Sequence, residues 1–588
     1  MSPFFRAAFL GVCAAAACAA LASAGTPLSG TPPPAPTPLA APPPAQTPPA
    51  QTPPLILILS GELDRNFRIL KEKADPAPYY IAYEVTEREA AGVSATLGAL
   101  DNTRREHSRV LDVTVRVGSP SLDSYHRIRG QYAHFTGGIP LPIEDNPAAI
   151  ARIVWLETDR VYRQAAERLI KIRSNRDVSV AETDDSADFS SETPSTFFEP
   201  PEPFVFPVEQ SEARVRKLSL AFDGFRPLIA SEVSLAASRE TRYFVNTEGT
   251  RLEHGRGFAS IAFSARSKAA DGMDLGAFDG FDATSVSALP KDEAILKAIA
   301  HVASLAAALP QAPVVDPYAG PAMLSGRAAA VLFHEIFGHR IEGHRQKDEN
   351  QDQTFTKMVG KPVLPGFLSV VFDPTRPKSG DTWLNGSYVY DDEGVKARPV
   401  TVVDKGTLEA FLMSRSPIRG FGQSNGHGRR QPGLEVVSRQ SNLFVESTEM
   451  VPESRLREIL LAEIRRQNKP YGLYFEQVTG GFTTTARQGM QAFKVIPVIV
   501  YRVYADGRPD ELVRGADIVG TPLASFAKIV ATGGQPEVFN GYCGAESGTV
   551  PVAAVAPAMV ITELEIQKKP KSEDRPPFLP APPEGGPQ

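Results

Sequence analysis

The residues best suited to chemistry lie in one short string, His334-Glu335-Ile-Phe-Gly338-His339. Neutral imidazoles bind Zn²⁺ without fully quenching its Lewis acidity, and a neighbouring carboxylate can accept a proton from a water that the metal polarises. The string therefore predicts a hydrolytic zinc site with Glu335 as general base. A pair of helix-capping histidines beside a solvated glutamate is the alternative interpretation.

The spacing of the two histidines differs from that of an ordinary zinc-binding helix. They are five residues apart, which turns the second roughly 140° away from the first on an ideal helix. An unbroken helix cannot direct both at one ion, so we expect a break, an overwound turn or a bulge between them, with Gly338 supplying the freedom. Upstream, Ser325 is a suitable N-cap and the alanines after it favour a helix.

A catalytic zinc site takes three protein ligands and a water, so a third ligand is needed. His344 and Glu342 are close in sequence. Cys543 is distant, and it lies in the segment 540–544, Asn-Gly-Tyr-Cys-Gly, which we expect to form a flexible turn that presents the side chain. A lone Cys could also be a buried apolar residue or a reactive thiol.

The first residues have the pattern of an export signal. Arg6 precedes an apolar run of small residues at 7–22, and Leu21-Ala-Ser-Ala24 offers a cleavage site, so we expect a mature chain that begins at Gly25 and is periplasmic or secreted. An uncleaved anchor and a lipoprotein modified at Cys18 are alternatives. We expect no transmembrane span in the mature protein. Cys13 and Cys18 leave with the signal, and Cys543 then remains as the one Cys.

Length and composition indicate two domains. A chain of 588 residues is too long for one core, and a formal net charge of −6 argues against a nucleic-acid binder. We predict an α+β protein in which an N-terminal α/β domain, with a mixed sheet and flanking helices, precedes a β-rich metallopeptidase domain. The expected segments are a signal peptide at 1–24, a disordered Pro/Ala/Thr-rich linker at 25–54, the two domains at 55–310 and 311–567, and a disordered tail at 568–588.

Hydrophobic periodicity places the main elements. Helices are expected at 60–73, 147–173, 290–309, around His334, and at 453–466. Strands are expected at 79–85, 110–117, 367–372, 387–390, 400–403, 408–413, 443–445, 492–504 and 558–566. The Pro-rich, Phe-bearing stretch 177–210 is either a surface excursion or an aromatic flap over a cleft.

Several motifs of the second domain resemble those of the TldD/PmbA peptidase family. They are Tyr318-Ala-Gly-Pro-Ala-Met-Leu, the His-Glu string with Glu342-Gly343 after it, Asp391-Asp-Glu-Gly394, Asp404-Lys-Gly-Thr-Leu408, Gly480-Gly481, Arg514-Gly-Ala-x-x-x-Gly520, Cys543-Gly544 and Val550-Pro-Val552. The resemblance implies zinc held by His334, His339 and Cys543. It also implies Glu335 as general base, an extended peptide as substrate, and a dimer that encloses the sites, formed with a second copy or with a PmbA-like subunit.

Other polar residues are weaker candidates. His344, Arg429, Gly480 and Gly481 are candidates for substrate binding, although His344 could be structural and 426–430 could be a surface loop. The acidic residues 391–393 could bind a second metal or form a solvated turn. Arg340 and His344 depart from the resemblance, since other members more often have small or acidic residues there.

The sequence thus predicts an exported zinc peptidase that hydrolyses unfolded or extended peptides. The alternative is a non-catalytic envelope subunit that binds a peptide or a partner, and a hydrolase for non-peptide bonds is a third possibility. The intact set of two histidines, glutamate and cysteine argues against a non-catalytic subunit.

Overall fold

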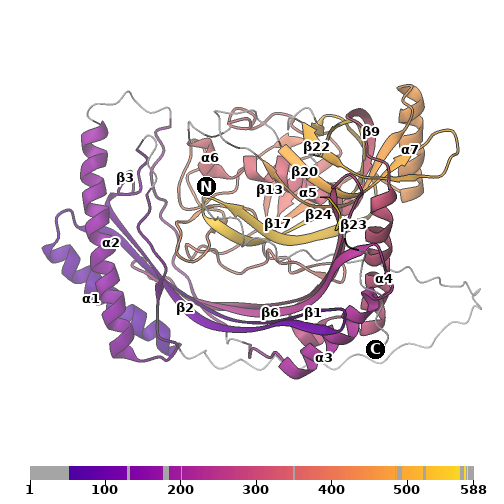
Figure 1. Cartoon of the computed structure of the whole chain (residues 1–588). Helices are drawn as coiled ribbons and strands as arrows, with labels where there is room; N and C mark the ends of the chain where they lie inside the picture. The colour runs from indigo at the N-terminus through magenta and orange to yellow at the C-terminus, as the bar shows by residue number, and fades with distance from the viewer. Residues whose placement is uncertain are drawn as a thin grey trace, which may run out of the picture.

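The computed structural model contains two large sheets, one from each half of the chain (Figure 1). It describes residues 52–128, 133–176, 184–199, 202–348, 351, 353–483, 485, 493–520, 525–569, 575–577 and 579. The expected signal peptide, nearly all of the linker and most of the tail lie outside these residues, so those interpretations stay predictions.

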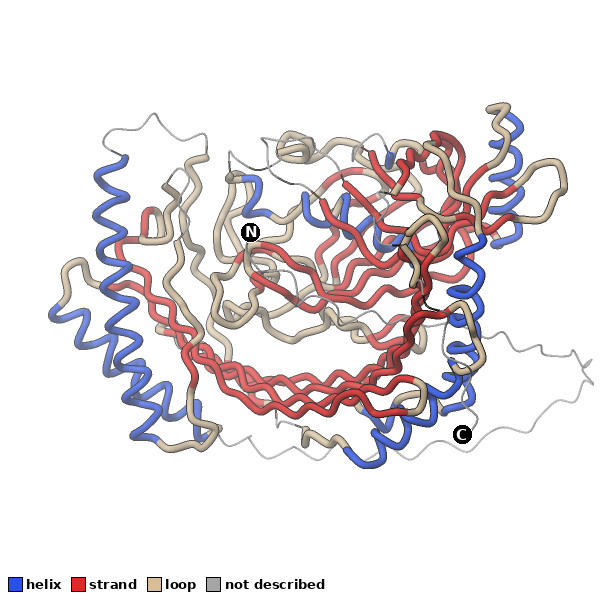
Figure 2. The backbone as a smooth tube through the Cα atoms, in the orientation of Figure 1, coloured by secondary structure: helices blue, strands red, loops and turns tan. Residues whose placement is uncertain are grey.

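The first sheet is long, strongly curved and almost entirely antiparallel (Figure 2). Its order is β3 (Leu122–Asp123), β2 (Ala99–Ser119), β1 (Pro78–Thr96), β6 (Leu228–Asn246), β7 (Arg251–Lys268) and β5 (Thr196–Phe198), with β4 (Ile139–Pro140) beside β2 and β8 (Asp274–Ala283) beside β7. The short β5 runs parallel to β7, which makes the sheet mixed, as predicted.

Helices cover the two ends of this sheet (Figure 1). They are α1 (Pro54–Lys73) and α2 (Pro147–Arg176) at one end, and α3 (Val208–Ser219) and α4 (Asp292–Ala308) at the other, with short 3₁₀ turns η1 (Leu220–Phe222), η2 (Val286–Ala288) and η3 (Leu309–Gln311). Each pair buries an apolar stripe in its own core cluster. The segment Asp292–Gln311 is also long and apolar enough to cross a membrane. Its Ile295, Ile299 and Val302 are buried in the core.

The second sheet curves back on itself because one strand pairs at both of its edges. The path is β14 (Thr407–Leu408), β13 (Val400–Asp404), β10 (Leu368–Phe372), β17 (Asn442–Ser447), β24 (Gly548–Lys568), β22 (Ala516–Gly520), β20 (Phe493–Val503), β19 (Gly472–Thr483) and β9 (Tyr318–Leu324). Because β9 also pairs with β24, the last five strands form a closed ring. Beside this path lie β18 (Met450–Val451), β21 (Glu511–Val513) and β23 (Ile529–Ala545).

The remaining elements complete the C-terminal half. They are α5 (Gly326–Ile336), η4 (Gly338–Arg340), α6 (Gly343–Gln346), α7 (Glu453–Arg466), and the small hairpins β11 (Lys378–Ser379) with β12 (Thr382–Trp383) and β15 (Gly428–Arg429) with β16 (Val437–Ser438). Every residue of α5 is buried, and the helix packs against β24, β19 and β23. The structure is therefore an α+β fold in which the fully buried helix α5 lies inside the second half.

Two expected strands do not form. Residues 387–390 contribute one isolated bridge, and 408–413 form a strand only at Thr407–Leu408. The apolar pattern of 408–413 reflects burial against the segment after α5 instead of sheet pairing, since Leu412 N donates to Ile341 O and Gly343 N donates to Leu412 O.

The interpretation of 177–210 as a surface excursion or as an aromatic flap over a cleft stays a prediction, since Phe189 of this stretch lines a cavity with Tyr80 and His344. The five phenylalanines of the stretch pack against the N-terminal sheet. They are Phe189, Phe197, Phe198, Phe204 and Phe206.

Candidate metal centre

The helix that carries His334 and Glu335 begins and ends as the sequence predicts. The Ser325 side chain accepts a hydrogen bond from Ala328 N at 3.1 Å. The α-helix ends at Ile336, and a separate 3₁₀ turn carries His339. The helix is therefore broken between the two histidines, which lets two side chains five residues apart approach each other despite the helical period.

Gly338 is required at this break by close packing. A Cβ atom there would lie 1.9 Å from Oε1 of Gln440. The same Gln440 donates from Nε2 to His334 O at 3.2 Å, which holds the end of α5 in place. Gly338 is therefore needed because a side chain would not fit beside Gln440. The conformational freedom expected from the sequence is not the reason.

Cys543 lies in a strand and not in the predicted flexible turn. It belongs to β23 and pairs with Val550 of β24 in a regular antiparallel register. The segment 540–544 is therefore part of a regular hairpin of β23 with β24. Because alternate side chains of a strand face opposite sides, Tyr542 is exposed while Cys543 is buried.

The structure brings His334, His339 and Cys543 together into what we call the metal-ligand cluster. One potential ligand atom from each residue lies within 4.8 Å of the other two, and all three residues are buried. The Cys543 Sγ atom is 3.3 Å from His339 Nε2. Two imidazoles and a thiol are a ligand set that Zn²⁺ takes. The buried Nδ1 of His334 has no hydrogen-bond partner among the described residues, so the donor set fits a metal ion.

The carboxylate of Glu335 lies beside this cluster. Its side chain is buried, and a Cβ on Gly481 would lie 2.7 Å from Glu335 Cγ, so the predicted Gly481 lies directly against the predicted base. Burial raises the pKa of Glu335 despite the opposing effect of His334 and His339. A solvated glutamate is therefore excluded.

The electrostatics of the cluster favour a thiolate. Burial alone would raise the pKa of Cys543, but the imidazoles of His339 and His334 and the guanidinium of Arg439 lower it well below the usual value. Burial would likewise lower the pKa of His339, but Cys543 and Glu342 raise it well above the usual value. Thiolate is the form of Cys that binds metal.

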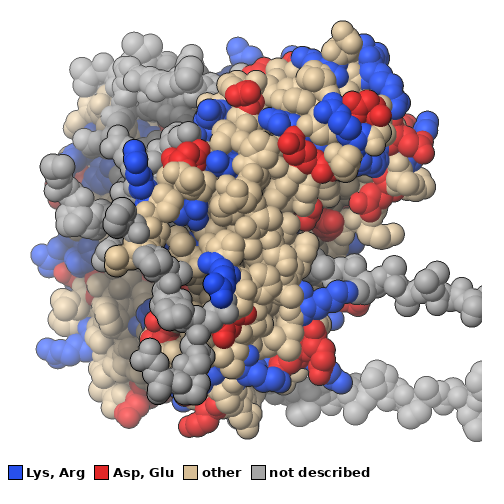
Figure 3. Space-filling view, turned by 45° about the vertical axis from the view of Figure 1, so that its right-hand side comes forward, with Lys and Arg blue, Asp and Glu red and all other residues tan. Residues whose placement is uncertain are grey.

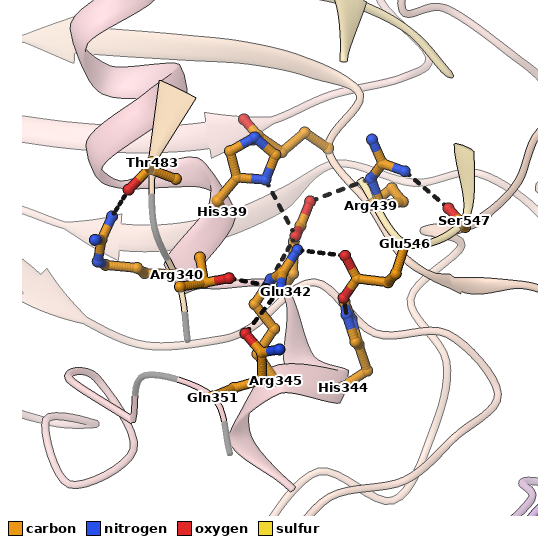
Figure 4. A network of polar contacts seen from close by, with 12 residues as sticks. His339, Arg340, Glu342, His344, Arg345, Gln351, Arg439, Thr483, Glu546 and Ser547 are labelled. Carbon is orange, nitrogen blue, oxygen red and sulfur yellow. Dashed lines mark hydrogen bonds and ion pairs between the residues drawn. The ribbon is translucent and has the colours of Figure 1, made fainter. Parts of the chain in front are cut away.

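A network of charged side chains, all buried except Glu546, lies around His339 (Figure 4). Its members include Glu342, Arg345, Arg439 and Glu546. Glu342 was a candidate third ligand from its position in the sequence, but Cys543 fills that place and Glu342 faces the other ring nitrogen of His339. The roles of Arg439 and Glu546 were missed, because their partners are distant in sequence.

The other predicted substrate residues are not part of the cluster. His344 is buried with Nε2 2.5 Å from Glu546 Oε1, so it is neither partly exposed nor within the ligand set. The segment 426–430 is buried and not a surface loop. Arg429 uses Nη1 to donate to Gln440 O and Pro551 O at 2.7 and 2.8 Å. Gly480 has a φ of +155°, and a Cβ added there would meet no described atom within 4 Å.

The acidic residues 391–393, which we call the acidic turn, are not solvated. Asp391 accepts from the backbone N–H groups of Glu393, Val395 and Gly428 at 2.9 to 3.0 Å. Asp392 pairs with Arg242 of the first sheet and accepts from Arg430 N. The acidic turn therefore joins the two halves of the molecule, and no metal-ligand group other than the cluster above is found among the described residues.

Comparison with known proteins finds relatives of the C-terminal half of the chain. Residues 318–568 match the PmbA/TldA metallopeptidase C-terminal domain. The C-terminal half of the chain is therefore similar to a domain of the TldD/PmbA family. A metalloprotease TldD homolog of Haemophilus influenzae is 26% identical over 293 residues, which are 49% of this chain and 55% of the relative. A zinc metalloprotease TldD homolog of Saccharolobus solfataricus is 25% identical over 255 residues, 42% of this chain and 52% of the relative.

The family likeness extends to the fold of most of the chain. The crystal structure of TldE from Thermococcus kodakarensis superposes with a TM-score of 0.59 and 14% identity, covering 87% of this chain and 100% of that one. At this identity the similarity shows the fold alone. The chain spans about half the length of the curated relatives that it matches.

Proposed function

We propose that this protein is a zinc-dependent peptidase that hydrolyses unfolded or extended peptides. The observation that carries the proposal is the convergence of His334, His339 and Cys543, with one ligand atom from each within 4.8 Å of the others. The relatives named metalloproteases support the same class of activity. Zinc, when bound by these three residues, would supply Lewis acidity toward a peptide carbonyl.

Glu335 is the residue that we assign to proton transfer. Its carboxylate accepts the proton of the attacking water and delivers it to the leaving amine nitrogen. A buried carboxylate with a raised pKa is suited to both steps, because its pKa is closer to the working pH than the pKa of an exposed glutamate. The absence of a Cβ on Gly481 leaves room for this side chain.

The test compares peptide hydrolysis by the mature chain before and after treatment with a chelator. We expect activity to be lost with the metal and restored by added zinc, with an unfolded protein cleaved much faster than the same protein in its native form. Zinc binding without hydrolysis of any peptide would favour the non-catalytic subunit. Hydrolysis that is unaffected by the chelator would contradict the proposal.

We further propose export with cleavage after Ala24, and a dimer, formed with a second copy or with a PmbA-like subunit, that restricts the site to extended peptides. The export pattern at 6–24 supports the first part. The interspersed acidic and basic side chains on the face in Figure 3 give no support to a nucleic-acid partner. Mass spectrometry of the exported chain and light scattering of the folded protein test the two parts.

A further inference from the structure

The carboxylate of Glu342 lies between the two segments that supply metal ligands. It is fully buried at the start of α6, three residues after His339. Its Oε2 is 3.3 Å from His339 Nδ1 and accepts from Arg345 Nε at 2.9 Å. Its Oε1 is 3.5 Å from Arg439 Nε. One carboxylate thus contacts a ligand imidazole on one side and an arginine on the other.

Arg439 in turn contacts the hairpin that carries Cys543. It is fully buried, and its Nη2 donates to Cys543 O at 2.6 Å. Its Nη1 donates to Ser547 Oγ at 2.8 Å and to Gly548 O at 2.9 Å. These bonds fix the end of the β23–β24 hairpin, as Figure 4 shows for Ser547.

We propose that Glu342 and Arg439 are positioning residues of the metal centre, an inference that rests on the proposed zinc-binding role of the cluster. Glu342 accepts the Nδ1 proton of His339, which fixes the ring and leaves Nε2 directed toward Cys543. Arg439 joins this carboxylate to the Cys543 backbone. The potential ligands on η4 and β23 are thereby held at a fixed position relative to each other. Outer partners of this kind orient metal-bound histidines and raise their basicity.

The chain offers a matched control for a purely structural role. Glu84 is also a buried carboxylate paired with two arginines, Arg430 at 2.5 Å and Arg242 at 3.0 Å. It lies in β1, and its described hydrogen bonds and ion pairs are with residues outside the metal-ligand cluster. Replacing either glutamate removes one carboxylate partner from two buried arginines, but only Glu342 contacts a potential metal ligand.

The experiment measures zinc affinity of the full chain by competition with a chelator of known affinity, together with thermal unfolding and the visible spectrum of the Co²⁺-loaded protein. The variants are Glu342→Gln, Glu342→Met, Arg439→Lys and the control Glu84→Gln. We expect Glu342→Met and Arg439→Lys to weaken zinc binding by about 10- to 100-fold and to change the Co²⁺ spectrum. Glu342→Gln, which keeps an acceptor for Nδ1–H, should lose less affinity. Glu84→Gln should lower the unfolding temperature and keep wild-type affinity.

The outcomes separate this inference from the proposed function. A wild-type chain that binds no zinc would overturn both. Wild-type zinc affinity in folded Glu342 and Arg439 variants would overturn the positioning roles alone. An equal loss of zinc affinity in Glu84→Gln would also overturn the positioning roles, because a general loss of stability would then explain the weaker binding. If Glu342→Met does not fold, the isosteric Glu342→Gln and the charge-conserving Arg439→Lys decide.

Discussion

The metal-ligand cluster and the acidic turn are both buried groups of ionisable side chains, and they differ in how their polar atoms are satisfied. In the acidic turn, Asp391 and Asp392 accept hydrogen bonds from backbone N–H groups and from Arg242. In the metal-ligand cluster, His339 and Cys543 face each other and His334 Nδ1 has no partner among the described residues. What distinguishes the metal-ligand cluster is therefore that three potential metal ligands converge within 4.8 Å, while the carboxylates of the acidic turn are occupied by N–H groups and arginines.

The difference between the two groups shows that composition alone does not distinguish a ligand-binding site from a set of ion pairs that joins the two halves of the molecule. Both motifs are short strings of metal-binding residue types, and both were candidates for metal binding from sequence. The acidic turn uses its charge to join β1 and β6 to the second half through Glu84, Arg242 and Arg430. We therefore expect substitutions there to change stability, and substitutions in the metal-ligand cluster to change chemistry.

The largest expected effect is on stability, from Asp392→Ala in the acidic turn. The substitution removes one of the three carboxylates that pair with Arg242 and leaves Arg430 N without this acceptor. Removing one partner of a buried ion pair costs about 3–5 kcal/mol. Denaturant unfolding of the variant and wild type measures the difference in free energy of unfolding. A decrease in the free energy of unfolding of less than about 1 kcal/mol would show that the acidic turn does not stabilise the contact between the two halves.

The next effect is on turnover, from Glu335→Gln. Gln has nearly the same shape but cannot accept the proton, so we expect peptide hydrolysis to fall by about a hundredfold or more while zinc remains bound. The matched control is Glu393→Gln, which keeps an acceptor for Arg415 N and should keep wild-type turnover. Near-normal hydrolysis by Glu335→Gln would remove its assigned role.

A smaller effect is expected on metal affinity from Cys543→Ser. A hydroxyl is a poor zinc ligand compared with a thiolate, so zinc affinity should fall by at least about tenfold. The serine fits the space of the cysteine, so the unfolding temperature of the metal-free protein should change little. Chelator competition measures the first quantity and calorimetry the second. Unchanged affinity would exclude Cys543 from the ligand set.

The smallest expected effect is the pH dependence of stability from the acidic turn. Burial and the neighbouring Glu393 raise the pKa of Asp391 to about 8. The unfolded chain loses this proton near the ordinary value of 3.8, so between these values the folded state binds more protons and its stability falls as pH rises. Glu393→Gln removes the like charge and should flatten this slope. Unfolding temperatures between about pH 5 and 8 measure it, and an equal slope in both proteins would contradict the assignment.

Local features of the sequence were sufficient to predict the secondary structure around the site. Ser325 and the alanines after it specify α5, and the spacing of His334 and His339 required the break that separates α5 from η4. The long helices at 147–176 and 453–466 also follow from local periodicity and Pro at the start. These are short-range effects, which depend on residues within a turn or two of each other.

Contacts between distant segments were decided only by the tertiary structure. Cys543 was placed with the histidines by family resemblance, and its position in a paired strand and not a turn depends on the register of β23 with β24. The acidic turn is buried because β1 and β6 lie over it, and Gly338 is required because Gln440 approaches it. The sequence by itself determined which residues could bind a metal, and that a helix carries His334 and is broken before His339. Packing between segments that are far apart in the chain determined which buried charges form ion pairs and which residues come together as potential metal ligands. No local pattern encodes those distances.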